Sequence, residues 1–227
     1  MNENRYLVII PAFNEAENIG RIVNEVRNTA PGFDILVVND CSEDNTREEL
    51  LKCGCNCIDL SNNLGIGGAM QTGYKWADDH GYDVAVQIDG DGQHDPSYLE
   101  EMVKIIGGGT DMVIGSRYID RRGYQSTAPR RAGIRYFSRL IGMLTGQTVT
   151  DPTSGMRAVG KELIRVFAGN YPADYPEPES TVLAIKKGYS VSEIPVEMRE
   201  RHSGSSSIAG VMPLYYMIKV TIGILSA

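Results

Sequence analysis

The stretch Val84-Ala-Val-Gln-Ile-Asp-Gly-Asp-Gly-Gln-His-Asp95 indicates both the fold class and the place of a functional site. Residues 84–88 form a short, largely apolar and β-branched run, which predicts a buried strand. Asp89 ends this run, and Gly90 and Gly92 interrupt the chain directly after it. A strand that ends in a glycine-rich loop presents its last side chains at the carboxyl edge of a sheet. Open α/β sheets bind their ligands at that edge.

Asp89 and Asp91 are candidate metal ligands, because one residue separates them in a turn and both carboxylates can face one point. Gln93 adds an amide oxygen to this set. Such hard oxygen ligands suit Mg²⁺ or Mn²⁺, ions that also bind the phosphates of substrates. A solvated Asx-glycine turn is the alternative. An EF-hand calcium loop does not fit, because its sixth position requires glycine and is His94 here, and because a strand precedes the loop.

Strands and helices alternate along the first half of the chain. Apolar runs predict strands over residues 6–10, 35–38, 57–60, 84–88 and 112–115. Helices are predicted between them, the first with Asn14 as its cap and Glu17 completing a capping box. This order predicts an α/β fold with a mainly parallel central sheet, flanking helices and right-handed crossovers. Helices are also predicted over 132–144, 161–167 and 179–187, and residues 191–200 are expected to be extended, with Pro195 at a sheet edge.

One domain is expected over residues 1–210, followed by an apolar helix over residues 211–227 whose one charged residue is Lys219. At ~1.5 Å per residue this helix is about 25 Å long, which is shorter than the ~30 Å hydrocarbon core of a bilayer. We therefore expect it to lie in a membrane interface or to insert partly, with Tyr215 and Tyr216 at the interface. A helix packed on the domain is the alternative.

Charge is distributed unevenly along this acidic chain, whose formal net charge is −7. Residues 1–116 carry 7 basic and 20 acidic side chains, whereas residues 117–139 carry seven arginines and one aspartate. Residues 140–227 carry 8 of each sign. This distribution argues against general nucleic-acid binding. The arginine-rich segment is expected to meet phosphate groups on a ligand or on a lipid surface, with a solvated helix face as the alternative.

Two other motifs do not predict a site. Gly65-Ile-Gly-Gly68 lacks the third glycine of a dinucleotide fingerprint and does not follow the first strand, so no NAD site is predicted. The sulfurs of Cys53-Gly-Cys-Asn-Cys57 do not have the Cys-x-x-Cys spacing of zinc sites, and we interpret them as reduced cytosolic thiols. The N-terminus shows no signal-peptide pattern.

Seven short motifs follow one another along nearly the whole chain. They are Pro11-Ala-Phe-Asn-Glu15, Asn39-Asp-Cys-Ser42, Asn63-Leu-Gly65, Asp89-Gly-Asp-Gly-Gln93, Gly115-Ser-Arg-Tyr118, Ser154-Gly-Met-Arg157, and Arg201 with Gly204 and Ser206. Each motif is weak alone, but the ordered set is specific. Together they resemble the family 2 glycosyltransferases of the GT-A fold, and among these the dolichyl- and polyprenyl-phosphate sugar synthases.

The resemblance implies an inverting, Mg²⁺- or Mn²⁺-dependent transfer of a sugar from a UDP- or GDP-linked donor to an undecaprenyl- or dolichyl-type polyprenyl phosphate. It implies that the nucleotide-sugar contacts Pro11, Ala12, Phe13, Glu15, Val38, Asp40, Asp89, Gly90 and Asp91. It implies that the acceptor phosphate contacts Arg117, Arg131, Arg201 and Ser206. Its implied metal ligands are Asp89, Asp91 and Gln93. The candidate catalytic residues are Asp89, Asp91, Arg117 and Asp151, the last as a general base for a hydroxyl acceptor.

Two positions depart from the family pattern. Many members have aspartate where this chain has Asn39, and dolichyl-phosphate mannose synthases often have a phosphate-binding lysine where it has Ser207. The alternative acceptor is a glycan hydroxyl, and the alternative from a different class is a non-catalytic metal- or nucleotide-binding module. The expected location is the cytoplasmic face of the cell membrane. The expected partners are the membrane surface and either a small membrane protein or a second copy of the chain.

Overall fold

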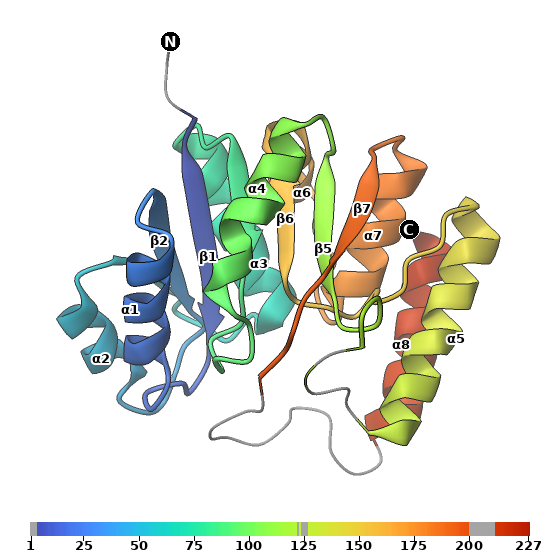
Figure 1. The fold of residues 1–227 in the computed structure, drawn as a ribbon. Helices are drawn as coiled ribbons and strands as arrows, with labels where there is room; N and C mark the ends of the chain where they lie inside the picture. The colour runs from blue at the N-terminus through green and yellow to red at the C-terminus, as the bar shows by residue number, and fades with distance from the viewer. Residues whose placement is uncertain (1–3, 122, 124–126, 200–211) are drawn as a thin grey trace.

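The computed structural model describes residues 4–121, 123, 127–199 and 212–227, which form a three-layer α/β/α domain (Figure 1). The described strands form one seven-stranded sheet in the order β3-β2-β1-β4-β6-β5-β7. They are β1 (Tyr6–Ala12), β2 (Phe33–Asn39), β3 (Asn56–Asp59), β4 (Val84–Gln87), β5 (Met112–Ser116), β6 (Arg157–Gly160) and β7 (Val191–Pro195). The sheet is parallel except for β6, which confirms the predicted fold class. Pro195 lies in an edge strand, as expected.

Helices cover both faces of the sheet (Figure 1). One face is covered by α1 (Ile19–Thr29), α2 (Thr46–Cys53), the short 3₁₀ helix η1 (Pro96–Tyr98) and α4 (Leu99–Gly107). The other is covered by α3 (Gly65–Asp79), α6 (Lys161–Gly169) and α7 (Pro176–Lys186). Beyond α7 lie α5 (Ala128–Thr145) and α8 (Met212–Ser226), side by side.

The central strand β1 shows how the sequence specifies these layers. Leu7 and Ile9 pack into the core shared with α3 and α6, whereas Val8 and Ile10 pack into the core shared with α1 and α4. All four side chains are fully buried. Each contributes about 1.5–3 kcal/mol by leaving water. The strand is therefore held from both sides, and its carboxyl end is a rigid platform.

The strand β6 is not predicted by the sequence pattern, which indicates a turn-rich patch over residues 151–157 and then a helix. It has four residues and begins with a charged one, so no apolar periodicity marks it. It runs antiparallel between β4 and β5, with Arg157 paired to Gln87 and Gly160 to Val84. Its antiparallel direction places the residues before Arg157 at the carboxyl end of β4, directly beside Asp89.

The first helix begins later than the capping pattern predicts. The expectation of Asn14 as its cap is wrong, because α1 begins at Ile19 after the N-cap residue Asn18. Asn14 has a positive φ of 56°. Its side-chain oxygen accepts a hydrogen bond from the N–H of Glu43 at 2.8 Å, and its own N–H donates to the hydroxyl of Ser42 at 2.9 Å. These local bonds join the loops after β1 and β2, and they compete with helix formation.

The C-terminal helix α8 packs on the domain with one face and exposes the other. Val220 and Ile224 are buried in the core that also contains Phe137 of α5. The opposite face carries exposed apolar side chains, namely Tyr215, Ile218, Ile222 and Leu225. Among the described residues, no helix has the length and hydropathy that crossing a membrane requires. Packing on the domain, the alternative given for this helix, therefore explains the buried face of α8 but not its exposed apolar face.

Candidate active site

The carboxyl ends of β1, β2 and β4 meet at one edge of the sheet. Pro11 and Ala12 of β1 pair with Val38 and Asn39 of β2. Gly90 follows β4 and lies so close to β1 that a Cβ atom on it would be 3.0 Å from the carbonyl oxygen of Pro11. The structure therefore brings together four of the residues predicted to contact the nucleotide-sugar. Val38 is fully buried, so it supports this edge from below.

Three further residues of the predicted nucleotide site lie on loops that follow β1 and β2. The ring of Phe13 is 47% exposed and offers a flat apolar face on which a base can stack. Asp40 is almost buried, and its carboxylate accepts a hydrogen bond from the N–H of Leu64 at 2.7 Å. The carboxylate of Glu15 accepts one from the amide of Asn18 at 2.8 Å. Asp40 and Glu15 thus shape the loops around the edge.

Hydrogen bonds within the loop define the conformation of the Asp89–Asp91 turn. The N–H of Asp89 donates to Nδ1 of the buried His94 at 2.9 Å, and the N–H of Gln93 donates to the carboxylate of Asp91 at 3.0 Å. Gly92 has a φ of +78°, a conformation that favours glycine. His94 was not predicted as part of the site, although it lies within the quoted stretch. Its role is to fix the backbone of the turn.

The two carboxylates fit a divalent cation. The Asp89 side chain is 39% exposed, and a Cβ atom on Gly155 would lie only 2.7 Å from its Oδ1 atom. Glycine at that position therefore leaves the space that this carboxylate occupies. In the described part of the chain, no cluster of three His, Cys, Asp or Glu side chains could hold a metal alone. Asp89 and Asp91 would therefore bind the ion together with the oxygens of a donor diphosphate.

The amide of Gln93 has a protein partner. Its Nε2 atom donates to the carbonyl oxygen of Arg199 at 3.3 Å, and the N–H of Arg199 donates to the carbonyl oxygen of Gln93 at 3.0 Å. The guanidinium of Arg199 also forms ion pairs with Glu25 and Asp95. These contacts fasten the segment after β7 to the Asp89–Asp91 turn. They explain why Gln93 belongs here, and its place among the metal ligands remains a prediction.

Arg117 and Asp151 form a buried ion pair. Nε and Nη2 of Arg117 donate to the two carboxylate oxygens of Asp151 at 2.6 and 2.7 Å. Asp151 is fully buried and Arg117 is 6% exposed. This arrangement argues against Asp151 as a general base, because its carboxylate is engaged and enclosed. It also argues against Arg117 as a direct phosphate ligand. The pair instead positions the chain around it.

Glu193 of β7 holds the segment that contains Asp151. Its carboxylate accepts hydrogen bonds from the N–H groups of Thr150 and Asp151, at 2.7 and 2.9 Å. The hydroxyls of Thr150 and Ser116 lie 2.6 Å apart. Sequence reasoning did not identify Glu193, because its partners lie more than forty positions earlier in the chain. The hydrogen bonds fix Thr150 at the wall of the neighbouring pocket.

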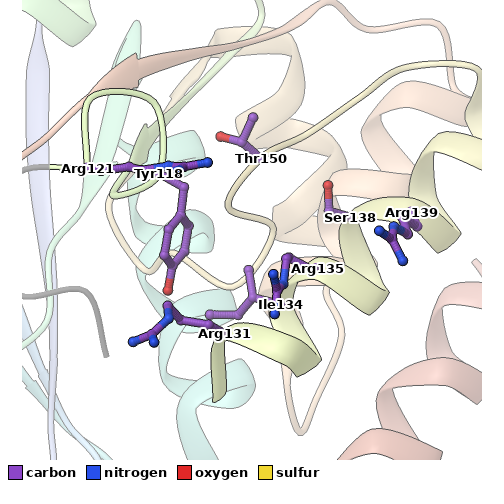
Figure 2. A pocket seen from close by; sticks show the side chains of 8 residues that line it. All are labelled: Tyr118, Arg121, Arg131, Ile134, Arg135, Ser138, Arg139 and Thr150. Atoms are coloured by element: carbon purple, nitrogen blue, oxygen red, sulfur yellow. The ribbon is translucent and has the colours of Figure 1, made fainter. Parts of the chain in front are cut away.

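An arginine-lined pocket of about 510 Å³ lies next to the buried pair (Figure 2). Its lining residues are Tyr118, Arg121, Arg131, Ile134, Arg135, Ser138, Arg139 and Thr150, none of which is acidic. Tyr118 and Thr150 are the chain neighbours of Arg117 and Asp151, so the ion pair supports one wall. Arg131, one of the predicted acceptor contacts, is among these lining residues. Arg201 and Ser206, the other predicted acceptor contacts, lie outside the described residues.

Tyr118 is a neutral hydrogen-bond donor in this pocket at physiological pH. Burial raises the pKa of its phenol. The positive charges of Arg117, Arg130 and Arg131 oppose this change, and the charge of Asp151 reinforces it. The net pKa is above its ordinary value, so the phenol keeps its proton. Its ring points from the β5 side toward Arg131 on α5 (Figure 2).

The family model for glycosyl transferase family 2 matches residues 7–167. The match includes the edge formed by β1 and β2, the Asp89–Asp91 turn and the Arg117–Asp151 pair. The chain is a family 2 glycosyltransferase. This glycosyltransferase has the fold and the carboxylate turn expected of an enzyme that takes its sugar from a nucleotide donor.

Relatives of this glycosyltransferase differ in the sugar that their names report. It is 32% identical to a polyprenol monophosphomannose synthase of Mycolicibacterium smegmatis, over 95% of this chain and 85% of that one. It is also 32% identical to a UDP-N-acetylglucosamine–dolichyl-phosphate N-acetylglucosaminyltransferase of Methanococcus voltae, over 87% and 86%. A crystal structure of the glucosyl-3-phosphoglycerate synthase of Mycobacterium tuberculosis, with Mn²⁺, UDP-glucose and phosphoglyceric acid, superposes with a TM-score of 0.76. The superposition covers 98% of this chain and 79% of the synthase chain, at 18% sequence identity, and so supports the fold.

Proposed function

We propose that this glycosyltransferase moves one sugar from a nucleoside-diphosphate donor to a polyprenyl phosphate at the cytoplasmic face of the membrane. The observation that carries the proposal is the pocket beside the Arg117–Asp151 pair, whose lining has four arginines and no acidic residue. Guanidinium groups bind phosphate oxygens in pairs, with charge-assisted hydrogen bonds about twice as strong as neutral ones. The names of the relatives support a lipid-phosphate acceptor of this kind.

The proposed reaction needs little acid–base chemistry from the protein. A phosphate oxygen of the acceptor attacks the anomeric carbon on the face opposite the leaving group, and the bond to the nucleoside diphosphate breaks. The acceptor is already an anion at neutral pH, so no residue has to remove a proton. The divalent ion bound by Asp89 and Asp91 would neutralise charge on the departing diphosphate. The chain's own contribution is to position both substrates and to exclude water.

The alternative acceptor, a glycan hydroxyl, requires a general base. Asp151 was the candidate, and its carboxylate is fully buried and engaged by Arg117 at 2.6 and 2.7 Å. Burial lowers the pKa of Arg117, but Asp151, Tyr118 and Asp89 raise it, so the guanidinium remains charged and the pair stays closed. This geometry favours the phosphate acceptor over the hydroxyl.

Arg131→Ala is expected to reduce transfer to undecaprenyl phosphate by about tenfold or more, because it removes one charged phosphate ligand from the pocket. Binding of UDP and GDP should change less than about twofold, because the nucleotide edge is formed by other loops. The measurement is lipid-linked product formation alongside calorimetric nucleotide binding. Arg165→Ala on α6, an exposed arginine paired with Glu162, is the matched control. If nucleotide affinity falls as much as transfer to the lipid, Arg131 contacts the donor rather than the acceptor.

We also propose that the outer faces of α5 and α8 contact the membrane. The two helices lie side by side, and the hydroxyls of Tyr136 and Thr221 are 3.2 Å apart. Both helices carry exposed apolar side chains, including Met143 and Ile222, and α5 also carries the exposed Arg135. Apolar insertion and attraction to anionic headgroups, about 1 kcal/mol per basic residue, together give a two-signal attachment.

An Ile218→Glu, Ile222→Glu double variant is expected to lose sedimentation with anionic liposomes and to keep its nucleotide affinity. Both side chains are more than half exposed, so the change should cost little stability. Deleting the helix is a less clean test, because it would remove Val220 and Ile224 from the core. Wild-type sedimentation should weaken at high salt without disappearing. If the double variant still sediments, the membrane contact lies elsewhere on the molecule. The exposed face of α8 would then be a candidate surface for a small membrane protein or for a second copy of the chain.

A further inference from the structure

A buried polar side chain lies on β4, two residues before the carboxylate turn. Gln87 is the last residue of this strand and is fully buried. It pairs with Ile9 of β1 on one side and with Arg157 of β6 on the other. Side chains alternate along a strand, so Gln87 faces the same side of the sheet as Ala85, which belongs to the core that α3 and α6 cover. An apolar side chain is the one expected at such a position.

The amide of Gln87 satisfies only part of its hydrogen-bonding capacity. Its Nε2 atom donates to Oδ1 of Asp89 at 3.4 Å. Its Oε1 atom is buried and has no hydrogen-bond partner in the described part of the chain. Turning the amide over would not help, because its oxygen would then face a carboxylate, which is an acceptor as well. A buried acceptor without a partner destabilises the folded state, so this amide lowers stability relative to an apolar side chain of similar shape.

The two carboxylate oxygens of Asp89 have different neighbours. Oδ1 accepts the hydrogen bond from Gln87, and Oδ2 lies 3.8 Å from Nε2 of His94. Nδ1 of His94 accepts the N–H of Asp89, so the neutral imidazole carries its proton on Nε2. A Cβ atom on Gly155 would lie 2.7 Å from Oδ1 and 2.8 Å from Oδ2. An amide, an imidazole and a close main-chain segment therefore limit the orientations that this carboxylate can adopt.

We propose that Gln87 is a positioning residue that orients the Asp89 carboxylate for the divalent ion of the donor diphosphate. This inference rests on the proposed function. Groups that hydrogen-bond to a metal ligand fix its orientation, and their loss typically weakens metal binding by about 10–100-fold. At 3.4 Å the bond is long for an amide donor, so it affects the direction of the carboxylate more than the stability of the fold. An unpaired buried amide beside a metal ligand is consistent with a functional role rather than with packing.

Gln87→Met in the full chain separates these two roles, because methionine has a similar length and no amide. The apparent affinity for Mn²⁺ is measured by electron paramagnetic resonance with saturating UDP or GDP, whichever wild type binds more tightly. It should fall by about tenfold. Binding of the same nucleotide without metal should change less than about twofold. In urea unfolding with EDTA, the variant should be at least as stable as wild type, because it loses an unpaired buried acceptor.

Gln71→Met on α3 is the matched control. The amide of Gln71 also donates a single long hydrogen bond, to the carbonyl oxygen of Ala168 on α6 at 3.3 Å, and its Mn²⁺ affinity should equal that of wild type. Unchanged Mn²⁺ affinity in Gln87→Met would overturn the inference. A variant that loses stability together with Mn²⁺ affinity would also overturn it, because Gln87 would then serve the packing of the fold.

The same measurements distinguish this inference from the proposed acceptor. If Gln87→Met weakens Mn²⁺ binding as expected but wild type gives no lipid-linked product with any donor, the acceptor assignment fails and the role of Gln87 stands. If wild type binds no Mn²⁺ in the presence of either nucleotide, the metal site and the role of Gln87 both fail.

Discussion

An Asp91→Asn variant is expected to fold like wild type and to lose about 10²–10³-fold of its metal-dependent sugar transfer. Asp91 is 5% exposed, and its carboxylate accepts the N–H of Gln93 at 3.0 Å. The asparagine amide oxygen can replace that acceptor, so the turn should persist. The charge that balances a divalent ion beside the diphosphate is lost. The rate of nucleoside-diphosphate release, followed as Mg²⁺ or Mn²⁺ is titrated, measures the effect.

Asp79→Asn provides the control for this substitution, because it removes one negative charge at the exposed end of α3. Its turnover should match that of wild type. An Asp91→Asn enzyme with undiminished turnover in Mg²⁺ would contradict the assignment of the carboxylate turn as the metal site. Thermal unfolding of the variant, measured without metal, should stay close to that of wild type.

Arg117→Met is expected to destabilise the fold by about 3–5 kcal/mol, because it leaves the fully buried Asp151 carboxylate without its cation. The same substitution in Arg165, whose ion pair is half exposed, should cost less than about 1 kcal/mol. Urea unfolding with a common m-value gives both numbers. This stability effect also means that Arg117 variants cannot report cleanly on acceptor binding, and that Arg131 is the better probe.

The double variant Arg117→Met, Asp151→Asn isolates the cause of that destabilisation. Asparagine carries no charge, and its amide oxygen can still accept the main-chain N–H of residue 117, which donates to the aspartate at 3.2 Å in the native protein. The double variant should therefore be more stable than Arg117→Met alone. If it is no more stable, lost packing rather than a buried charge explains the effect.

Much of this fold was predictable because the relevant signals are local. β1, β2 and β4 are covered on both faces by helices, and buried parallel strands read as continuous apolar runs. β6 gave no such signal: it has four residues, begins with Arg157 and depends on its neighbours for pairing. The predicted N-cap of α1 is wrong for a related reason. Asn14 satisfies its hydrogen bonds with Ser42 and Glu43, on a loop that the capping pattern cannot anticipate.

The same distinction holds in the active site. The Asp89–Asp91 turn could be predicted, because its strand, glycines and carboxylates are consecutive. The pairing of Arg117 with Asp151 could not, because 34 positions separate them and only the packing of the segment after α5 brings them together. That pairing argues against Asp151 as a general base and against Arg117 as a direct phosphate ligand. Arg157 likewise joins the start of β6 to the first turn of α7 through the carbonyl oxygen of Glu177, 20 positions later, a contact that no spacing in the sequence predicts.

The most direct test of the proposed function is a screen of UDP- and GDP-linked sugars with undecaprenyl phosphate, scored by the lipid-linked product. We expect one donor to give a sugar joined to the lipid through its phosphate, with one nucleoside diphosphate released per product formed. The reaction should require Mg²⁺ or Mn²⁺ and should fail with Asp91→Asn. Transfer of the sugar to a glycan hydroxyl, with no lipid-linked product from any donor, would contradict the account.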